Sequence, residues 1–109
     1  MKEIHIFGKF MLYLFTDSNM WNDAMSSHGE EDFYIKDEEM EYTNALTSVI
    51  HGDGLILSMY LKKDADIYTV IHESVHVVDF LIENIGLEHT EFRAYTVQYI
   101  VENIMKELE

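Results

Sequence analysis

The pattern of hydrophobic and polar positions divides the chain into a strand-like first half and a helical second half. Residues Glu3 to Phe15 are rich in Ile, Phe, Leu and Tyr, which indicates extended chain with a break at Gly8. Two further apolar runs, Tyr42 to Ile50 and Leu55 to Leu61, are separated by His51-Gly52-Asp53-Gly54. Apolar runs on either side of a Gly-Asp-Gly turn predict a β-hairpin.

The segment between these strands predicts one short helix and one solvated stretch. Thr16-Asp17-Ser18 offers N-cap residues for the helix. The stretch from Gly29 to Glu41 contains seven acidic residues, so we expect it to lie in solvent with at most a short strand at Phe33-Tyr34-Ile35. The inward face of the short helix is expected to consist of Met20, Trp21, Ala24 and Met25.

Two longer helices are predicted to close the chain. Asp64 or Asp66 can cap the first helix, and Gly86 can end it at the C′ position. Thr90 can cap the second helix, which runs to the C-terminus. The apolar set of the second helix is Ala94, Val97, Ile100, Val101, Ile104 and Leu108. Strands followed by helices in 109 residues predict a single α+β domain over residues 1–109.

The composition limits which side chains can bind a metal ion and which partners the protein can bind. The chain has no cysteine, which excludes disulfides and thiolate ligands, so any metal ion must bind to His, Asp or Glu. The formal net charge of −14, from 21 acidic and 7 basic side chains, disfavours nucleic acid and favours basic partners. No run of about 18 apolar residues is present to span a membrane, and the N-terminal segment has no signal-peptide pattern. We therefore expect a soluble, cytoplasmic protein.

One motif of the first long helix carries candidate chemistry. His72 and His76 are four residues apart, so their side chains point about 40° apart around the helix axis and can give two nitrogens to one zinc ion. Glu73 follows His72, which places a carboxylate beside the metal, where it can take a proton from bound water. The H-E-x-x-H pattern therefore predicts a zinc site. The competing interpretation is an ordinary amphipathic helix with a solvent-facing stripe of His72, His76, Asp79 and Glu83.

A catalytic zinc ion needs a third protein ligand, and the downstream candidates are Glu88, His89, Glu91 and Glu102. The run from His72 to His76, followed by Glu91-Phe92-Arg93-Ala94-Tyr95, resembles the zincin metallopeptidases of the gluzincin type. It also resembles small phage and prophage proteins that carry both motifs. The resemblance spans Leu55 to Ile104. It implies zinc binding by His72, His76 and Glu91, with Glu73 as general base and Ala94 as the small residue where two helices approach.

The resemblance also implies roles for a strand and a tyrosine. Zincins place an edge strand beside the active helix, where an extended substrate adds to the sheet, and Leu55 to Tyr60 is the matching segment. Tyr95 stands where many gluzincins carry an acid that supports a zinc-bound histidine. It can donate a hydrogen bond to an oxyanion, or it can pack as a half-buried core residue. Asp79 can take the role of the missing acid, or it can lie in solvent.

Helix geometry favours a different third ligand. A straight first helix that runs to Ile85 ends about 13 Å beyond His76. A short connection then places Glu91 level with that far end, and Glu102 lies nearer to the histidines. The family resemblance favours Glu91 as the third ligand, whereas the geometry of two antiparallel helices favours Glu102.

Two hypotheses of function follow from these patterns. The first is a minimal zinc metallopeptidase that hydrolyses a peptide or protein substrate with zinc-bound water and Glu73 as general base. The second is a small acidic binding protein, of phage origin, that blocks a basic host protein without catalysis. A zincin-like fold with structural zinc or lost catalysis combines the two.

Overall fold

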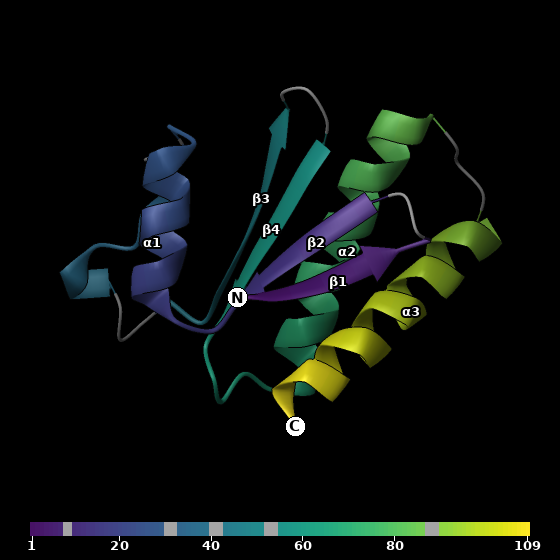
Figure 1. The fold of residues 1–109 in the computed structure, drawn as a ribbon. Coiled ribbons are helices and arrows are strands. Elements are labelled where there is room, and N and C mark those ends of the chain that lie inside the picture. Colours follow the sequence, from purple (N-terminus) through teal and green to yellow (C-terminus); the bar gives the residue numbers. More distant parts are fainter. Residues whose placement is uncertain (8–9, 30–32, 40–42, 52–54, 87–89) are drawn as a thin grey trace.

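The computed structural model describes residues 1–7, 10–29, 33–39, 43–51, 55–86 and 90–109. Within these ranges, strands of one sheet are packed between helices (Figure 1). The elements in chain order are β1 (Lys2–Ile6), β2 (Phe10–Phe15), α1 (Ser18–Ser27), a 3-10 turn (Asp37–Glu39), β3 (Ala45–His51), β4 (Leu55–Leu61), α2 (Ile67–Ile85) and α3 (Thr90–Leu108). The predicted α+β class and the predicted order of elements are confirmed. None of the described helices is long and apolar enough to cross a lipid bilayer.

The sheet consists of two hairpins joined side by side, in the strand order β1-β2-β4-β3. β1 pairs with β2 and β3 pairs with β4 in antiparallel fashion, whereas β2 and β4 are parallel. The expectation that Leu55 to Tyr60 forms a substrate-binding edge is wrong, because β4 is paired on both sides and has no free edge for another strand. The edge strand that contacts α2 is β3.

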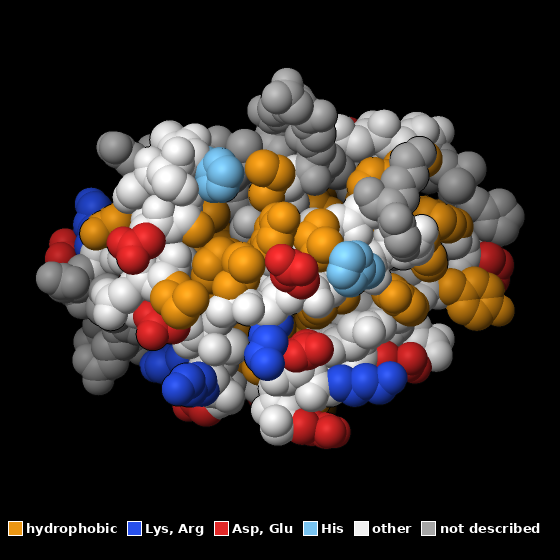
Figure 2. Space-filling view, viewed as in Figure 1, with side chains coloured by type: hydrophobic (Ala, Val, Ile, Leu, Met, Phe, Trp, Pro, Cys, Tyr) orange, Lys and Arg blue, Asp and Glu red, His pale blue; other side chains and the backbone are white. Residues whose placement is uncertain are grey.

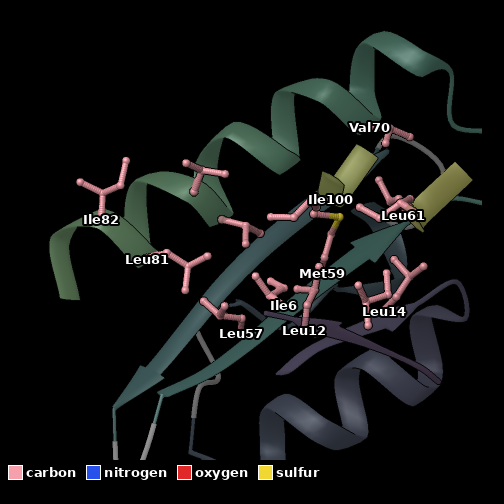
Figure 3. Packing of buried hydrophobic residues seen from close by; sticks show 14 residues of the cluster. Ile6, Leu12, Leu14, Leu57, Met59, Leu61, Val70, Leu81, Ile82 and Ile100 are labelled. Atoms are coloured by element: carbon pink, nitrogen blue, oxygen red, sulfur yellow. The ribbon is translucent and has the colours of Figure 1, made fainter. Parts of the chain in front are cut away.

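One face of the sheet packs against α2 and α3. Alternate strand residues such as Leu12 and Leu57 point to this face, as the two-residue repeat of a strand requires. In Figure 3, Leu81 of α2 lies toward Leu57, Val70 of α2 lies toward Leu61, and Ile100 of α3 lies toward Met59. Full burial of one such side chain contributes about 1.5–3 kcal/mol to stability. This packing fixes the rotation of α2 about its axis and therefore the direction of every side chain on it.

The opposite face of the sheet is partly covered by α1. A second core cluster there consists of Phe15, Trp21, Met25, Ile35 and Tyr60. Burial raises the pKa of the Tyr60 phenol, with smaller effects from the negative charges of Asp17 and Asp64. On the part of this sheet face that α1 leaves uncovered, the side chains of Met11, Tyr13 and Ile56 are half-buried. Figure 2, which views the molecule from the side of α1, shows hydrophobic side chains near its centre.

Within the acidic stretch after α1, the described residues Phe33 and Ile35 are held more closely to the protein than the composition predicts. Ile35 is only 2 % exposed, because it belongs to the cluster under α1. Its backbone N–H donates to Asn22 Oδ1 at 2.7 Å, and its carbonyl accepts from Asn22 Nδ2 at 2.8 Å. Trp21 Nε1 donates to the Phe33 carbonyl at 2.7 Å. The segment is therefore held to the helix by side chains, and no strand forms at Phe33 to Ile35.

The start of α1 and both ends of α2 follow the predicted signals, whereas α3 begins at Thr90, the residue predicted to cap it; two residues expected to face inward are exposed. Asp17 caps α1 and Asp66 caps α2, and Gly86 ends α2 with a left-handed φ of 74°. Met20, expected to face inward, is 47 % exposed. Ala94 is also exposed, whereas Ile100 and Ile104 of the same predicted set are buried.

Candidate metal centre

The imidazoles of His72 and His76 meet on the exposed side of α2. Their Nε2 atoms lie 3.2 Å apart, and the two rings are inclined at 80°. Two nitrogens bound to one zinc ion at about 2.05 Å and a tetrahedral angle lie about 3.3 Å apart. The same contact can be a hydrogen bond in which one neutral imidazole donates and the other accepts. The pair is therefore arranged to share either a proton or a metal ion.

Glu73 lies beside this pair but points toward the sheet. It is 6 % exposed, because its side chain faces β3 rather than solvent. Its Oε2 accepts a hydrogen bond of 3.2 Å from the hydroxyl of Thr47. Ligand atoms of His72, Glu73 and His76 all lie within 4.8 Å of one another. Two imidazoles and a carboxylate suit Zn²⁺ and also other first-row transition-metal ions, so the donor set fits zinc without selecting it.

A hollow of about 500 Å³ adjoins Glu73 and His72. It lies between the start of β3 and the first turn of α2, and its lining includes Ala45, Asp66 and Thr69. A molecule in this hollow can approach the Glu73 carboxylate from the side of the edge strand. The candidate site therefore combines metal-binding atoms, a buried carboxylate and space for a ligand.

The glutamates proposed as third ligands on α3 are not brought to the histidines. Glu91 lies nine residues before the buried Ile100, which is about 180° around the helix, and Glu91 is exposed. Glu102 is also exposed and accepts a hydrogen bond from Gln98. Neither belongs to the group of clustered metal-binding atoms found among the described residues. The other two candidates, Glu88 and His89, lie outside the described residues.

Tyr95 and Asp79 are both exposed. Tyr95 is 66 % exposed, so it is not a half-buried core residue, and it is not among the described residues that line the hollow. Asp79 forms an ion pair with Arg93 of α3. This pair links the two helices across their outer surfaces, and Asp79 is exposed, as the solvent-facing alternative predicts.

Thr47 belongs to the site although the H-E-x-x-H motif does not include it. Its neighbours at alternate positions, Ala45 and Val49, pack against the core beneath the helices. A threonine in such a row places a hydroxyl on the apolar face of a strand, where it needs a polar partner. That polar residue in an inward-facing position was the available signal, and Glu73 is its partner.

Comparison with protein families, with characterised proteins and with solved structures finds no match to this chain. The resemblance to gluzincins thus stays a prediction from two short motifs. The positions of His72, Glu73 and His76 relative to one another are the structural basis for a proposal of function.

Proposed function

We propose that this protein is a zinc-dependent hydrolase of peptide bonds, with His72 and His76 as metal ligands and Glu73 as general base. The observation that carries the proposal is the 3.2 Å separation of the two Nε2 atoms with the buried carboxylate of Glu73 beside them. An ordinary solvent-facing stripe does not require that its imidazoles converge or that the neighbouring glutamate be buried. A cytoplasmic location stays a prediction.

Each of the three side chains has a separate task in this proposal. The Nε2 atoms of His72 and His76 lie 3.2 Å apart, close enough to bind one ion when both rings are neutral. A bound zinc ion supplies a Lewis acid and increases the acidity of its water. Glu73 accepts the proton of the attacking water and later delivers it to the leaving nitrogen. Thr47 restrains the Glu73 carboxylate through Oε2 and leaves Oε1 available to handle that proton.

The edge strand β3 supports a peptide as the substrate. β3 pairs with β4 on one side only, and it contacts α2. An extended peptide can hydrogen-bond to the outer edge of such a strand, with side chains alternating between two faces. Because Thr47 of this strand touches Glu73, a peptide on β3 runs next to the proposed general base. The substrate edge is thus proposed at β3, in place of Leu55 to Tyr60.

The decisive experiment compares the wild-type protein with Glu73→Gln. Zinc is measured by elemental analysis after purification without added metal, and hydrolysis is measured with a peptide library. We expect equal zinc content in both proteins and hydrolysis in the wild type only. Glu83→Gln is the matched control, because Glu83 is an exposed glutamate on the same helix and its loss should leave hydrolysis unchanged.

Other outcomes have distinct meanings. Loss of zinc from Glu73→Gln would identify Glu73 as a ligand rather than the base. Equal hydrolysis in wild type and Glu73→Gln would rule out the proposed mechanism. Zinc in both proteins without hydrolysis in either would favour a non-catalytic metal site.

A further inference from the structure

The hollow next to Glu73 is built from the two elements that an extended substrate would contact. Its lining includes Thr43 and Asn44, which precede the edge strand β3, and Asp66, Tyr68 and Thr69 at the start of α2. His72 and Glu73 form the side nearest to the proposed metal ion. A peptide laid along β3 would pass this hollow, so one of its side chains can enter while the backbone lies beside Glu73.

The charge of the hollow is negative. Asp66 contributes a carboxylate at its edge, and the lining residues that the structure describes include no lysine or arginine. Hydrogen bonds from the Thr69 backbone N–H and hydroxyl to Asp66 Oδ1, at 2.8 and 3.0 Å, lower the pKa of Asp66. Asp66 is therefore ionised at neutral pH. Because it also occupies the N-terminus of α2, that helix end does not offer its amides to an anionic ligand.

The remaining lining groups suit a cation with several hydrogen-bond donors. Thr43, Asn44 and Thr69 carry side-chain oxygens, which can accept from an ammonium or guanidinium group. Tyr68 is 78 % exposed at the hollow, so its ring can stack against a cation. A purely aliphatic side chain would remove water from these polar groups without replacing their hydrogen bonds.

We infer that the hollow is a subsite for a lysine or arginine side chain of the peptide substrate. The inference rests on the proposed peptidase function and names the substrate class: peptides with a cationic residue close to the bond that is cleaved. Asp66 is the specificity-determining residue, and the net charge of −14 attracts such peptides from a distance.

Binding and hydrolysis are measured separately to test this subsite. Peptides of the form Ala-Ala-X-Ala-Ala, with X as arginine, lysine, norleucine or glutamate, are titrated into zinc-loaded Glu73→Gln, where the proposed hydrolysis is blocked. We expect arginine and lysine peptides to bind about fivefold more tightly than the norleucine peptide, the effect of one ion pair near solvent. Wild-type protein should cleave the same peptides in the same order of preference.

Asp66→Asn separates the charge from the helix cap. Asparagine is as good an N-cap as aspartate, so thermal unfolding should change little while the preference for arginine over norleucine disappears. Asp64→Asn is the matched control: it removes the same charge from the same connection, but Asp64 is not among the described lining residues. It should keep the preference.

The outcomes distinguish failure of the subsite from failure of the peptidase. Cleavage of all peptides at equal rates, with no effect of Asp66→Asn, would overturn the subsite and leave the peptidase intact. Binding that depends on arginine and on Asp66, without hydrolysis in the wild type, would overturn the peptidase and retain a cation-binding site. An equal loss of preference in Asp64→Asn and Asp66→Asn would also overturn the subsite, since it would assign the effect to net charge.

Discussion

The Thr47 hydroxyl on the edge strand donates a hydrogen bond of 3.2 Å to Glu73 Oε2 on α2. This contact joins the strand on which a peptide would lie to the carboxylate proposed as general base. Because Glu73 is 6 % exposed, few water molecules can replace the threonine. The orientation of the carboxylate therefore depends on the packing of α2 against β3.

Replacement of Thr47 by valine keeps the shape of the side chain and removes the donor. We expect Thr47→Val to reduce the unfolding free energy by about 1–3 kcal/mol, because a buried carboxylate loses a partner. We also expect about tenfold slower peptide hydrolysis with unchanged zinc content, since the base is less well oriented. Thr47→Ser retains the hydroxyl and should restore the hydrolysis rate. Failure of the serine variant to do so would show that packing, not the hydrogen bond, is what matters.

Zinc should stabilise the protein through the two histidines. At a free concentration about 100 times its Kd, zinc is expected to add about 2.7 kcal/mol of stability, and a chelator should remove this gain. In a domain of this size the gain raises Tm by about 10 °C or more. His72→Ala and His76→Ala should each abolish the shift. His5→Ala should preserve it, because His5 is an exposed histidine on β1, away from α2; an equal loss in His5→Ala would indicate non-specific binding.

The elements with local signals could be predicted from the sequence. Asp66 and Gly86 mark the ends of α2. The Gly-Asp-Gly sequence, which lies outside the described residues, predicts the hairpin whose strands β3 and β4 pair. The burial of Ile35 could not be read from its acidic neighbours, because it depends on Asn22 thirteen positions earlier. The interior position of β4 could not be read either. It results from parallel pairing of Leu12 with Leu57 across three intervening elements, which leaves no local pattern.

The candidate site shows the same division between local and non-local signals. The convergence of His72 and His76 follows from one helical turn and was predictable. The partner of Glu73, Thr47, comes from strand β3, and the position of α3 depends on how two helices pack. The position of Glu91 is such a non-local property. Its motif matches a family pattern, but its side chain faces away from the buried Ile100.

Replacement of Glu91 by glutamine tests whether Glu91 is a zinc ligand, as the family motif implies, or an exposed residue away from the histidines, as the structure places it. Glu91 is exposed and lies about 180° from the buried face of α3, so we expect Glu91→Gln to bind zinc about as tightly as the wild type. Competition with a chromophoric chelator measures this affinity. A decrease of more than about tenfold would support the role implied by the gluzincin resemblance. It would also require α3 to move when zinc binds.

Asn22 should be the main polar contributor to stability under α1. Its side chain bonds to both the N–H and the carbonyl of the buried Ile35. Asn22→Ala leaves two backbone groups without these partners, so we expect the unfolding free energy to fall by about 2–4 kcal/mol in urea denaturation. Asn19→Ala removes an exposed amide from the same helix and should change stability by about 0.5 kcal/mol at most. Equal effects of the two substitutions would contradict the assigned role.

Asp66 should make the unfolding free energy depend on pH under acidic conditions. Hydrogen bonds from Thr69 lower its folded-state pKa below the ordinary value of 3.8. The stabilisation is therefore complete above that value and is lost as the pH falls through the lower folded-state pKa, because protonation removes the charged acceptor. Asp66→Asn caps the helix without titrating. The difference in urea midpoint between the two proteins should therefore stay constant from pH 7 to about pH 5, and below about pH 4 the wild-type midpoint should fall relative to that of Asp66→Asn. Asp64→Asn, which does not cap α2, provides the charge-matched comparison. A wild-type profile parallel to that of Asp66→Asn across the whole range would show that the bonds to Thr69 do not favour the ionised carboxylate.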